Sequence, residues 1–114
     1  MKRGEYVPER GDIVWLDFAP QSGHEQTGRR PALVLSPLIY NKKTGLALFS
    51  PITSKIKNYP FEVAVKERFI SGVVLSDQIK SLDWRARNAD FICKMKKDDL
   101  ETVISLISAI LLAE

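Results

Sequence analysis

One polar stretch, residues 23–31, carries side chains that can perform acid-base and phosphate chemistry. His24 and Glu25 can exchange protons, and Arg30 presents a fixed fork of donors that can hold two phosphate oxygens. Glycines stand near both ends of the stretch, and Pro31 closes it. A polar connection between two apolar segments is often only a solvated loop, and that alternative stays open here. The functional interpretation is that two rigid strands present these groups to a substrate.

Thr53 adds a hydroxyl at the point where a later apolar segment gives way to a polar one. Cleavage of a phosphate diester without a metal uses an oxygen nucleophile. It requires a base, a cation for the phosphorane charge and an acid for the leaving oxygen. We therefore expect Arg30, Thr53, Glu25 and His24 to be the catalytic residues. Glu25 is a potential base if the folded site raises its pKa, and His24 is either an auxiliary proton carrier or an exposed loop residue.

Other side chains are candidates for contacts along a nucleic-acid groove. Those expected to contact phosphates are Lys55, Lys57, Lys80, Arg85 and Arg87. Asp77 and Gln78 can read base edges because both form directional hydrogen bonds, and Trp84 or Tyr59 can stack on a base. Taken singly, each is more often a surface charge or a core aromatic residue. Their proximity in sequence to Thr53 and Asp77 favours the nucleic-acid-binding interpretation modestly.

Short apolar segments bounded by Gly or Pro predict the strands that must position these groups. The expected strands are residues 12–18, 31–36, 46–50, 61–65, 72–76, 84–87 and 90–95. Pro51 is expected to halt the third, and Trp15 in the first is expected in the core. Residues 37–41 are expected to form one short helical turn, because Pro is tolerated at a helix start.

The C-terminal part of the chain has the periodicity of a helix. One apolar stripe consists of Leu100, Val103, Ile104, Ile107, Ile110 and Leu111. Asp98 and Glu101 have the spacing of a capping box at its start. The stripe fits a helix packed on the rest of the domain, and its far end also fits a contact with a second subunit.

Composition sets limits on the class of protein. The 114 residues are expected to form a single domain, 1–114, and 27% charged with 45% apolar residues is typical of a soluble globular chain. A net charge of +3 is compatible with nucleic acid but does not establish it. Cys93 is the only cysteine, so it is expected to be a core thiol without a disulfide partner. We expect no metal site, no cofactor, no membrane span and a cytoplasmic location.

Many short strands and one terminal helix predict a mainly β fold, a small curled antiparallel barrel with short helices. Beyond this architecture, the motifs themselves carry a resemblance. Residues 23–37 read Gly-His-Glu-Gln-x-Gly-x-Arg-Pro-Ala-Leu-Val-Leu-Ser-Pro, which resembles the signature of the MazF/PemK (Kid) toxins. These proteins are the ribonuclease halves of bacterial toxin–antitoxin pairs.

The resemblance covers nearly the whole chain except its helical C-terminal part. The further motifs are Gly11-Asp12-Ile13-Val14-Trp15, Tyr40-Asn41, Thr44-Gly45, Pro51-Ile52-Thr53-Ser54, Tyr59-Pro60-Phe61-Glu62-Val63, Gly72-Val73-Val74-Leu75, Asp77-Gln78 and Trp84-Arg85-Ala86-Arg87. Several motifs in a fixed order are far more specific than any one of them.

The resemblance implies an SH3-like barrel with a C-terminal α-helix that forms a homodimer. It implies a sequence-specific, metal-independent endoribonuclease (an mRNA interferase) that inhibits translation by cutting single-stranded RNA. The products would carry 2′,3′-cyclic phosphate and 5′-hydroxyl ends, and a cognate MazE-like antitoxin would neutralise the toxin. Asp77 matches an aspartate proposed as catalytic in the Kid branch, where an arginine stands two residues earlier. Leu75 occupies that position here, which favours Arg30 with Glu25 or His24.

Two alternatives remain. Gyrase-poisoning toxins share the implied fold, but by resemblance they depend on a tryptophan in a short C-terminal tail, and residues 109–114 contain no aromatic side chain. The other alternative is a barrel that binds RNA without cutting it. A cleavage assay with a chelator present distinguishes these alternatives.

Overall fold

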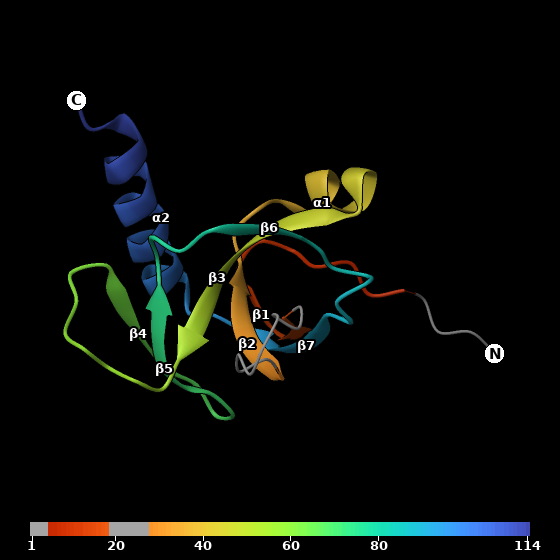
Figure 1. Cartoon of the computed structure of the whole chain (residues 1–114), viewed down its shortest axis with the longest axis horizontal. Helices are drawn as coiled ribbons and strands as arrows, with labels where there is room; N and C mark the ends of the chain where they lie inside the picture. The colour runs from red at the N-terminus through yellow and green to blue at the C-terminus, as the bar shows by residue number, and fades with distance from the viewer. Residues whose placement is uncertain (1–4, 19–27) are drawn as a thin grey trace, which may run out of the picture.

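The computed structural model describes residues 5–18 and 28–114, and Figure 1 shows a curled sheet with a long C-terminal helix. The elements follow in the order β1 (Asp12–Asp17), β2 (Arg29–Val34), α1 (Leu38–Thr44), β3 (Leu46–Thr53), β4 (Glu62–Lys66), β5 (Ser71–Leu75), β6 (Lys80–Asp83), β7 (Asp90–Lys94) and α2 (Lys97–Leu112). All strand pairs are antiparallel. The strand order is β4-β5-β3-β2-β1-β7, with β6 paired to β3 off this path. The expected mainly β, curled antiparallel fold is confirmed.

The sheet buries apolar side chains on both of its faces. Ile13 belongs to one core cluster, which includes Val103 and Ile107 of α2, whereas its neighbour Val14 belongs to a second cluster with Trp84. α2 packs against β4, and this packing covers the first face. Burial of both faces explains why Ile13, Val14 and Leu16 of β1 are all apolar.

β3 extends further than expected, because Pro51 lies within it rather than ending it. The Leu48 carbonyl accepts the Leu35 N–H at 2.8 Å on the β2 side. By strand alternation the Pro51 nitrogen faces the opposite side of β3. On that side β6 pairs only with Leu46–Phe49, and the pairing of β3 with β5 starts only at Ile52. Proline therefore falls in a gap between two partners, where its missing N–H removes no ladder hydrogen bond.

The expected strand at residues 84–87 is wrong, because this segment forms a turn between β6 and β7. The Asp83 carboxylate accepts the backbone N–H groups of Arg85 at 3.0 Å and Ala86 at 2.8 Å. Asn88 then adopts a left-handed backbone with φ of 54°. A carboxylate that binds the amides just after it favours a turn over a strand.

Two further expectations need correction. α2 begins after Lys96 without a side-chain cap, so the Asp98–Glu101 capping box is not formed. Asp98 and Asp99 still lie in the first turn, where negative charge favours a helix start. Trp15 is 38% exposed rather than buried, and it is the one exposed position of β1.

The segment before β1 is attached to the sheet through Asp12, which is almost fully buried. Its carboxylate accepts hydrogen bonds from the Tyr6 hydroxyl and the Glu9 N–H, and it pairs with the Lys94 ammonium at 2.6 Å. Burial, together with the hydrogen bond to Asp12, raises the pKa of Tyr6 well above its ordinary value of 10.0. The same carboxylate raises the pKa of Lys94 by hydrogen bonding.

Candidate active site

The side chains of Arg30 and its neighbour Arg29 point to opposite faces of β2, because side chains alternate along a strand. Arg29 lies opposite Asp17 of β1 and pairs with it at 2.7 Å, and it also donates to the Asn88 carbonyl at 2.7 Å. Hydrogen bonds from Asn88 and Arg29 lower the pKa of Asp17. Among the described residues Arg30 has no hydrogen-bond or ion-pair partner, so its guanidinium is available to a ligand. Sequence alone placed Arg30 in a loop, whereas the structure places it in a strand.

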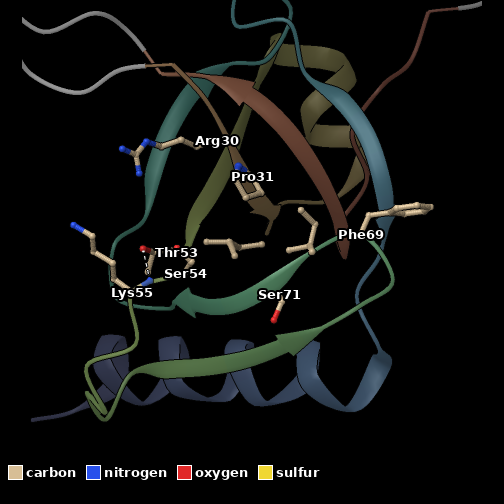
Figure 2. Close-up of a pocket in the computed structure, with 9 residues that line it drawn as sticks. Arg30, Pro31, Thr53, Ser54, Lys55, Phe69 and Ser71 are labelled. Carbon is tan, nitrogen blue, oxygen red and sulfur yellow. Dashed lines mark hydrogen bonds between the residues drawn. The ribbon is translucent and has the colours of Figure 1, made fainter.

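A pocket of about 480 Å³ lies between the Arg30 end of β2 and the Thr53 end of β3. Figure 2 shows the charged ends of Arg30 and Lys55 on the same side of this pocket as Thr53, with Phe69 at its other end. Its lining residues are Arg30, Pro31, Ile52, Thr53, Ser54, Lys55, Phe69, Ile70 and Ser71. Two cations and a hydroxyl at one pocket can bind a phosphate group.

Thr53 is fixed in place by its own strand and by β5. Its hydroxyl oxygen accepts the Lys55 N–H at 3.1 Å, so the hydroxyl proton remains available to donate. Beside it, Gly72 (φ +155°) allows β5 to approach closely, because a Cβ there would lie 2.3 Å from the Thr53 carbonyl oxygen. Glycine is thus required at residue 72 for this contact.

A second pocket, also about 480 Å³, adjoins the first through Thr53 and Lys55. It is lined by Thr53, Lys55, Lys57, Asn58, Tyr59, Pro60, Glu62, Leu75 and Gln78. The Tyr59 hydroxyl donates to the Asp77 carboxylate at 2.6 Å, and this hydrogen bond raises the pKa of Tyr59. Asp77 lines neither pocket, and its contribution is to hold the ring of Tyr59 at the wall of the second.

The other expected RNA contacts lie elsewhere. Arg85 pairs with Glu5 at 2.9 Å, and its guanidinium lies 4.9 Å from the centre of the Trp84 ring. Arg87 donates to the backbone carbonyl of Asp17 at 3.3 Å. Lys80 is exposed at the start of β6, and none of these three cations lines either pocket.

Trp84 is buried and donates its indole N–H to the Asn41 carbonyl at 2.9 Å, so the idea that it stacks a base is wrong. His24 and Glu25 lie outside the described residues, so their expected roles stay predictions. Burial raises the pKa of the Cys93 thiol, in keeping with a structural role.

Sequence reasoning missed the wall of the first pocket formed by residues 69–71 and the role of Gly72. A glycine inside an otherwise apolar strand segment is the signal that could have revealed the close approach. In the part of the chain that the structure describes, no three His, Cys, Asp or Glu side chains gather as metal ligands. No helix there is long and apolar enough to cross a membrane.

Comparisons with known proteins identify the family to which this sequence and fold belong. A family model described as "PemK-like, MazF-like toxin of type II toxin-antitoxin system" matches residues 9–111. The chain therefore belongs to the PemK-like, MazF-like toxin family of type II toxin-antitoxin systems.

Individual relatives match this chain along almost their full length. Endoribonuclease toxin MazF of Escherichia coli (strain K12) is 45% identical over 106 residues, which are 93% of this chain and 96% of that protein. Endoribonuclease toxin ChpB of the same strain is 36% identical over 116 residues, 96% of this chain and 97% of that protein. A crystal structure of MazE-MazF (Form-II) from Deinococcus radiodurans has a TM-score of 0.88 at 50% identity, covering 96% of this chain and 100% of the other.

Proposed function

We propose that the chain is an endoribonuclease toxin that cuts single-stranded RNA without a metal ion. The observation that carries this proposal is the first pocket, where the Arg30 guanidinium, which has no partner among the described residues, lies with the Thr53 hydroxyl and Lys55 around a space that fits a phosphate. The names of the relatives, which are endoribonucleases at 45% and 36% identity, support the same reaction.

The reaction is an internal transfer on the RNA strand. A base takes the proton of the 2′-hydroxyl, the 2′-oxygen bonds to phosphorus, and the bond to the 5′-oxygen breaks as an acid protonates it. The products are a 2′,3′-cyclic phosphate and a 5′-hydroxyl. Arg30 and Thr53 stabilise the phosphorane charge, and such preorganised donors contribute about 3–4 kcal/mol each in comparable sites. Lys55 supplies a phosphate contact for substrate binding. We assign the proton transfers to Glu25 and His24.

The second pocket continues the binding path for a single strand. Its wall carries the aromatic ring of Tyr59, on which a base can stack, and the side-chain amide of Gln78, which can read a base edge. Lys57 supplies a further phosphate contact at the same wall. An A-form duplex cannot present its base edges in this way, so the expected substrate is unpaired RNA.

The expected partner is a cognate MazE-like antitoxin, because the Deinococcus radiodurans relative is found in a MazE-MazF structure. An acidic antitoxin segment that orders as it binds would lie on the basic pockets and displace RNA. We further propose a cytoplasmic location, where mRNA is the accessible substrate, and a homodimer as the working unit.

The test is cleavage of a single-stranded RNA in excess EDTA, followed by mapping of the cut and analysis of both ends. We expect cleavage with cyclic phosphate and 5′-hydroxyl products, and resistance of an oligonucleotide with 2′-deoxyribose at the mapped position. The Arg30→Ala variant purified in parallel is the control for contaminating ribonuclease. Binding without cleavage would favour a non-catalytic RNA-binding barrel, and cleavage of the 2′-deoxy substrate at the normal rate would refute internal attack.

A further inference from the structure

Segment 54–61, which joins β3 to β4, is held at both ends by side chains. At one end the Thr53 hydroxyl oxygen accepts the Lys55 N–H at 3.1 Å. At the other, the two carboxylate oxygens of Glu62 accept the N–H groups of Lys57 and Asn58, each at 3.0 Å. The Glu62 N–H closes the same turn by donating to the Tyr59 carbonyl at 3.0 Å.

The Glu62 carboxylate determines the shape of this turn. Asn58 has a left-handed backbone with φ of 59°, a conformation that asparagine tolerates but that needs support. Hydrogen bonds from backbone amides to an ionised carboxylate are shorter and stronger than those between neutral groups. Glu62 itself is fixed, because it is half-buried as the first residue of β4 and pairs with Leu75 of β5.

Glu62 also occupies an electrostatically unfavourable place for a protein that binds RNA. Its carboxylate lines the second pocket beside Lys55 and Lys57, where a negative charge by itself repels phosphates. Both of its oxygens are already engaged with amides, so the carboxylate is poorly arranged to accept a substrate proton. The benefit that offsets this repulsion is the ordering of the lysine-bearing segment.

We propose that Glu62 is a positioning residue for substrate binding, which rests on the proposed function. Its carboxylate holds segment 54–61 in the one conformation that places Lys55 between the two pockets and Lys57 at the wall of the second. The residue acts through these lysines and does not touch the reacting atoms.

Two substitutions separate this role from a simple charge effect. Glu62→Gln removes the charge and replaces one acceptor oxygen with a donor, whereas Glu62→Asp keeps the charge but is too short to reach both amides. Glu101→Gln, at an exposed position of α2, is the matched control for loss of one negative charge. Thermal unfolding of each variant confirms that it is folded.

Steady-state cleavage of a single-stranded RNA gives the kinetic readout. A phosphate contact on a single strand contributes ~0.7 to the slope of log affinity against log salt, which is about fivefold in affinity at ~0.1 M salt. We therefore expect both Glu62 variants to raise KM about 5–10-fold, with kcat unchanged within ~2-fold and a shallower salt dependence. The control should match the unsubstituted protein.

Three kinetic results would overturn the proposal. A lower KM in Glu62→Gln with normal KM in Glu62→Asp would mean that the carboxylate only repels RNA. A loss of kcat with a missing limb in the pH profile would mean that it transfers a proton. An unchanged KM in both variants would mean that the segment is held without it.

An amide-exchange measurement judges the geometry independently of cleavage. We expect the N–H groups of Lys57 and Asn58 to exchange faster with solvent in Glu62→Gln than in Glu101→Gln. If no protein in the series cuts RNA, the proposed function fails while this measurement still decides whether Glu62 orders the segment. Equal exchange rates in the two variants would overturn the proposal.

Discussion

At the scale of single residues, adjacent Arg29 and Arg30 have opposite roles because a strand directs neighbouring side chains to opposite faces. Arg29 is held by Asp17, Asp90 and the Asn88 carbonyl, which join the β1–β2 pair to the turn before β7. Arg30 faces the first pocket and has no protein partner among the described residues. One guanidinium is therefore structural and the other is available for phosphate.

Arg30→Ala should lower the rate of RNA cleavage at least ~100-fold, because it removes a preorganised donor from the developing charge. Its midpoint of thermal unfolding should stay close to that of the unsubstituted protein, as for most exposed substitutions. Arg29→Ala should show the reverse, with a lower unfolding midpoint and a smaller loss of activity. Near-normal cleavage by folded Arg30→Ala would remove this residue from the mechanism.

Gly72→Ala should damage both stability and activity. The added Cβ meets the Thr53 carbonyl oxygen at 2.3 Å, so β3 and β5 must separate. We expect the free energy of unfolding, measured in urea, to fall by ~1–3 kcal/mol. Displacement of Thr53 by a fraction of an ångström should lower cleavage by up to about 100-fold.

Gly45→Ala is the matched control for a substitution at positive φ. Gly45 has φ of +76° at the end of α1, but an added Cβ there meets nothing within 4 Å. Backbone strain should cost about 1 kcal/mol of stability while cleavage stays normal. Equal effects of the two substitutions on cleavage would contradict a specific role for the Gly72–Thr53 contact.

At the scale of elements, the segment before β1 predicts how stability responds to alkaline pH. Burial and the hydrogen bond to Asp12 raise the pKa of Tyr6, and the hydrogen bond to Asp12 raises the pKa of Lys94. Each folded group thus keeps its proton when the unfolded chain, with ordinary values of 10.0 and 10.5, has begun to lose it. Their stabilising contribution is complete below pH ~10 and declines as the pH rises further.

Tyr6→Phe should remove part of this alkaline decline, because it eliminates one of the two groups. At pH 7 it should also cost about 1.5–3 kcal/mol, the usual value for a hydrogen bond to a charged partner. Urea unfolding at pH 7, 9 and about 10.5 measures both effects. Tyr40→Phe is the control, since Tyr40 is exposed and its hydroxyl donates no hydrogen bond within the described residues. An identical pH profile for the two variants would contradict the prediction.

Strands were predictable because their signal is local, whereas several boundaries depend on partners distant in sequence. Proline ends most strands, and Pro51 is tolerated within β3 only because it lies in the gap between the partners β5 and β6. The turn at 84–88 depends on Asp83 binding the amides that follow it, although residues 84–87 alternate apolar and charged side chains as a strand does. Arg30 and Thr53 were found through motif and chemistry, but the wall formed by residues 69–71 comes from a turn whose sequence suggests nothing about a pocket.

At the scale of the whole molecule, exposed apolar residues predict self-association. Ile110, Leu111 and Leu112 at the end of α2 are 42%, 73% and 78% exposed. Contiguous apolar surface of this kind commonly marks a protein contact. We expect light scattering at micromolar concentration to give twice the 12.9 kDa chain mass. A mass of one chain with full cleavage activity would contradict the homodimer.

β3 has a consequence for how a protein of this kind is controlled. It runs unbroken from Leu46 to Thr53 while its partners change, so the same strand borders β2, which carries Arg30, and β5, which supports Thr53. Within the described residues, assembling the first pocket therefore requires no movement of one lobe onto another.

A site that needs no such movement is regulated by the number of inhibitor molecules available to cover it. Each inhibitor molecule that covers a site silences that site, and the remaining output equals the number of uncovered copies. Cleavage would then rise from a threshold where toxin copies begin to exceed inhibitor copies. The cell would respond to a ratio of two abundances, and a short-lived inhibitor would turn a pause in protein synthesis directly into RNA decay.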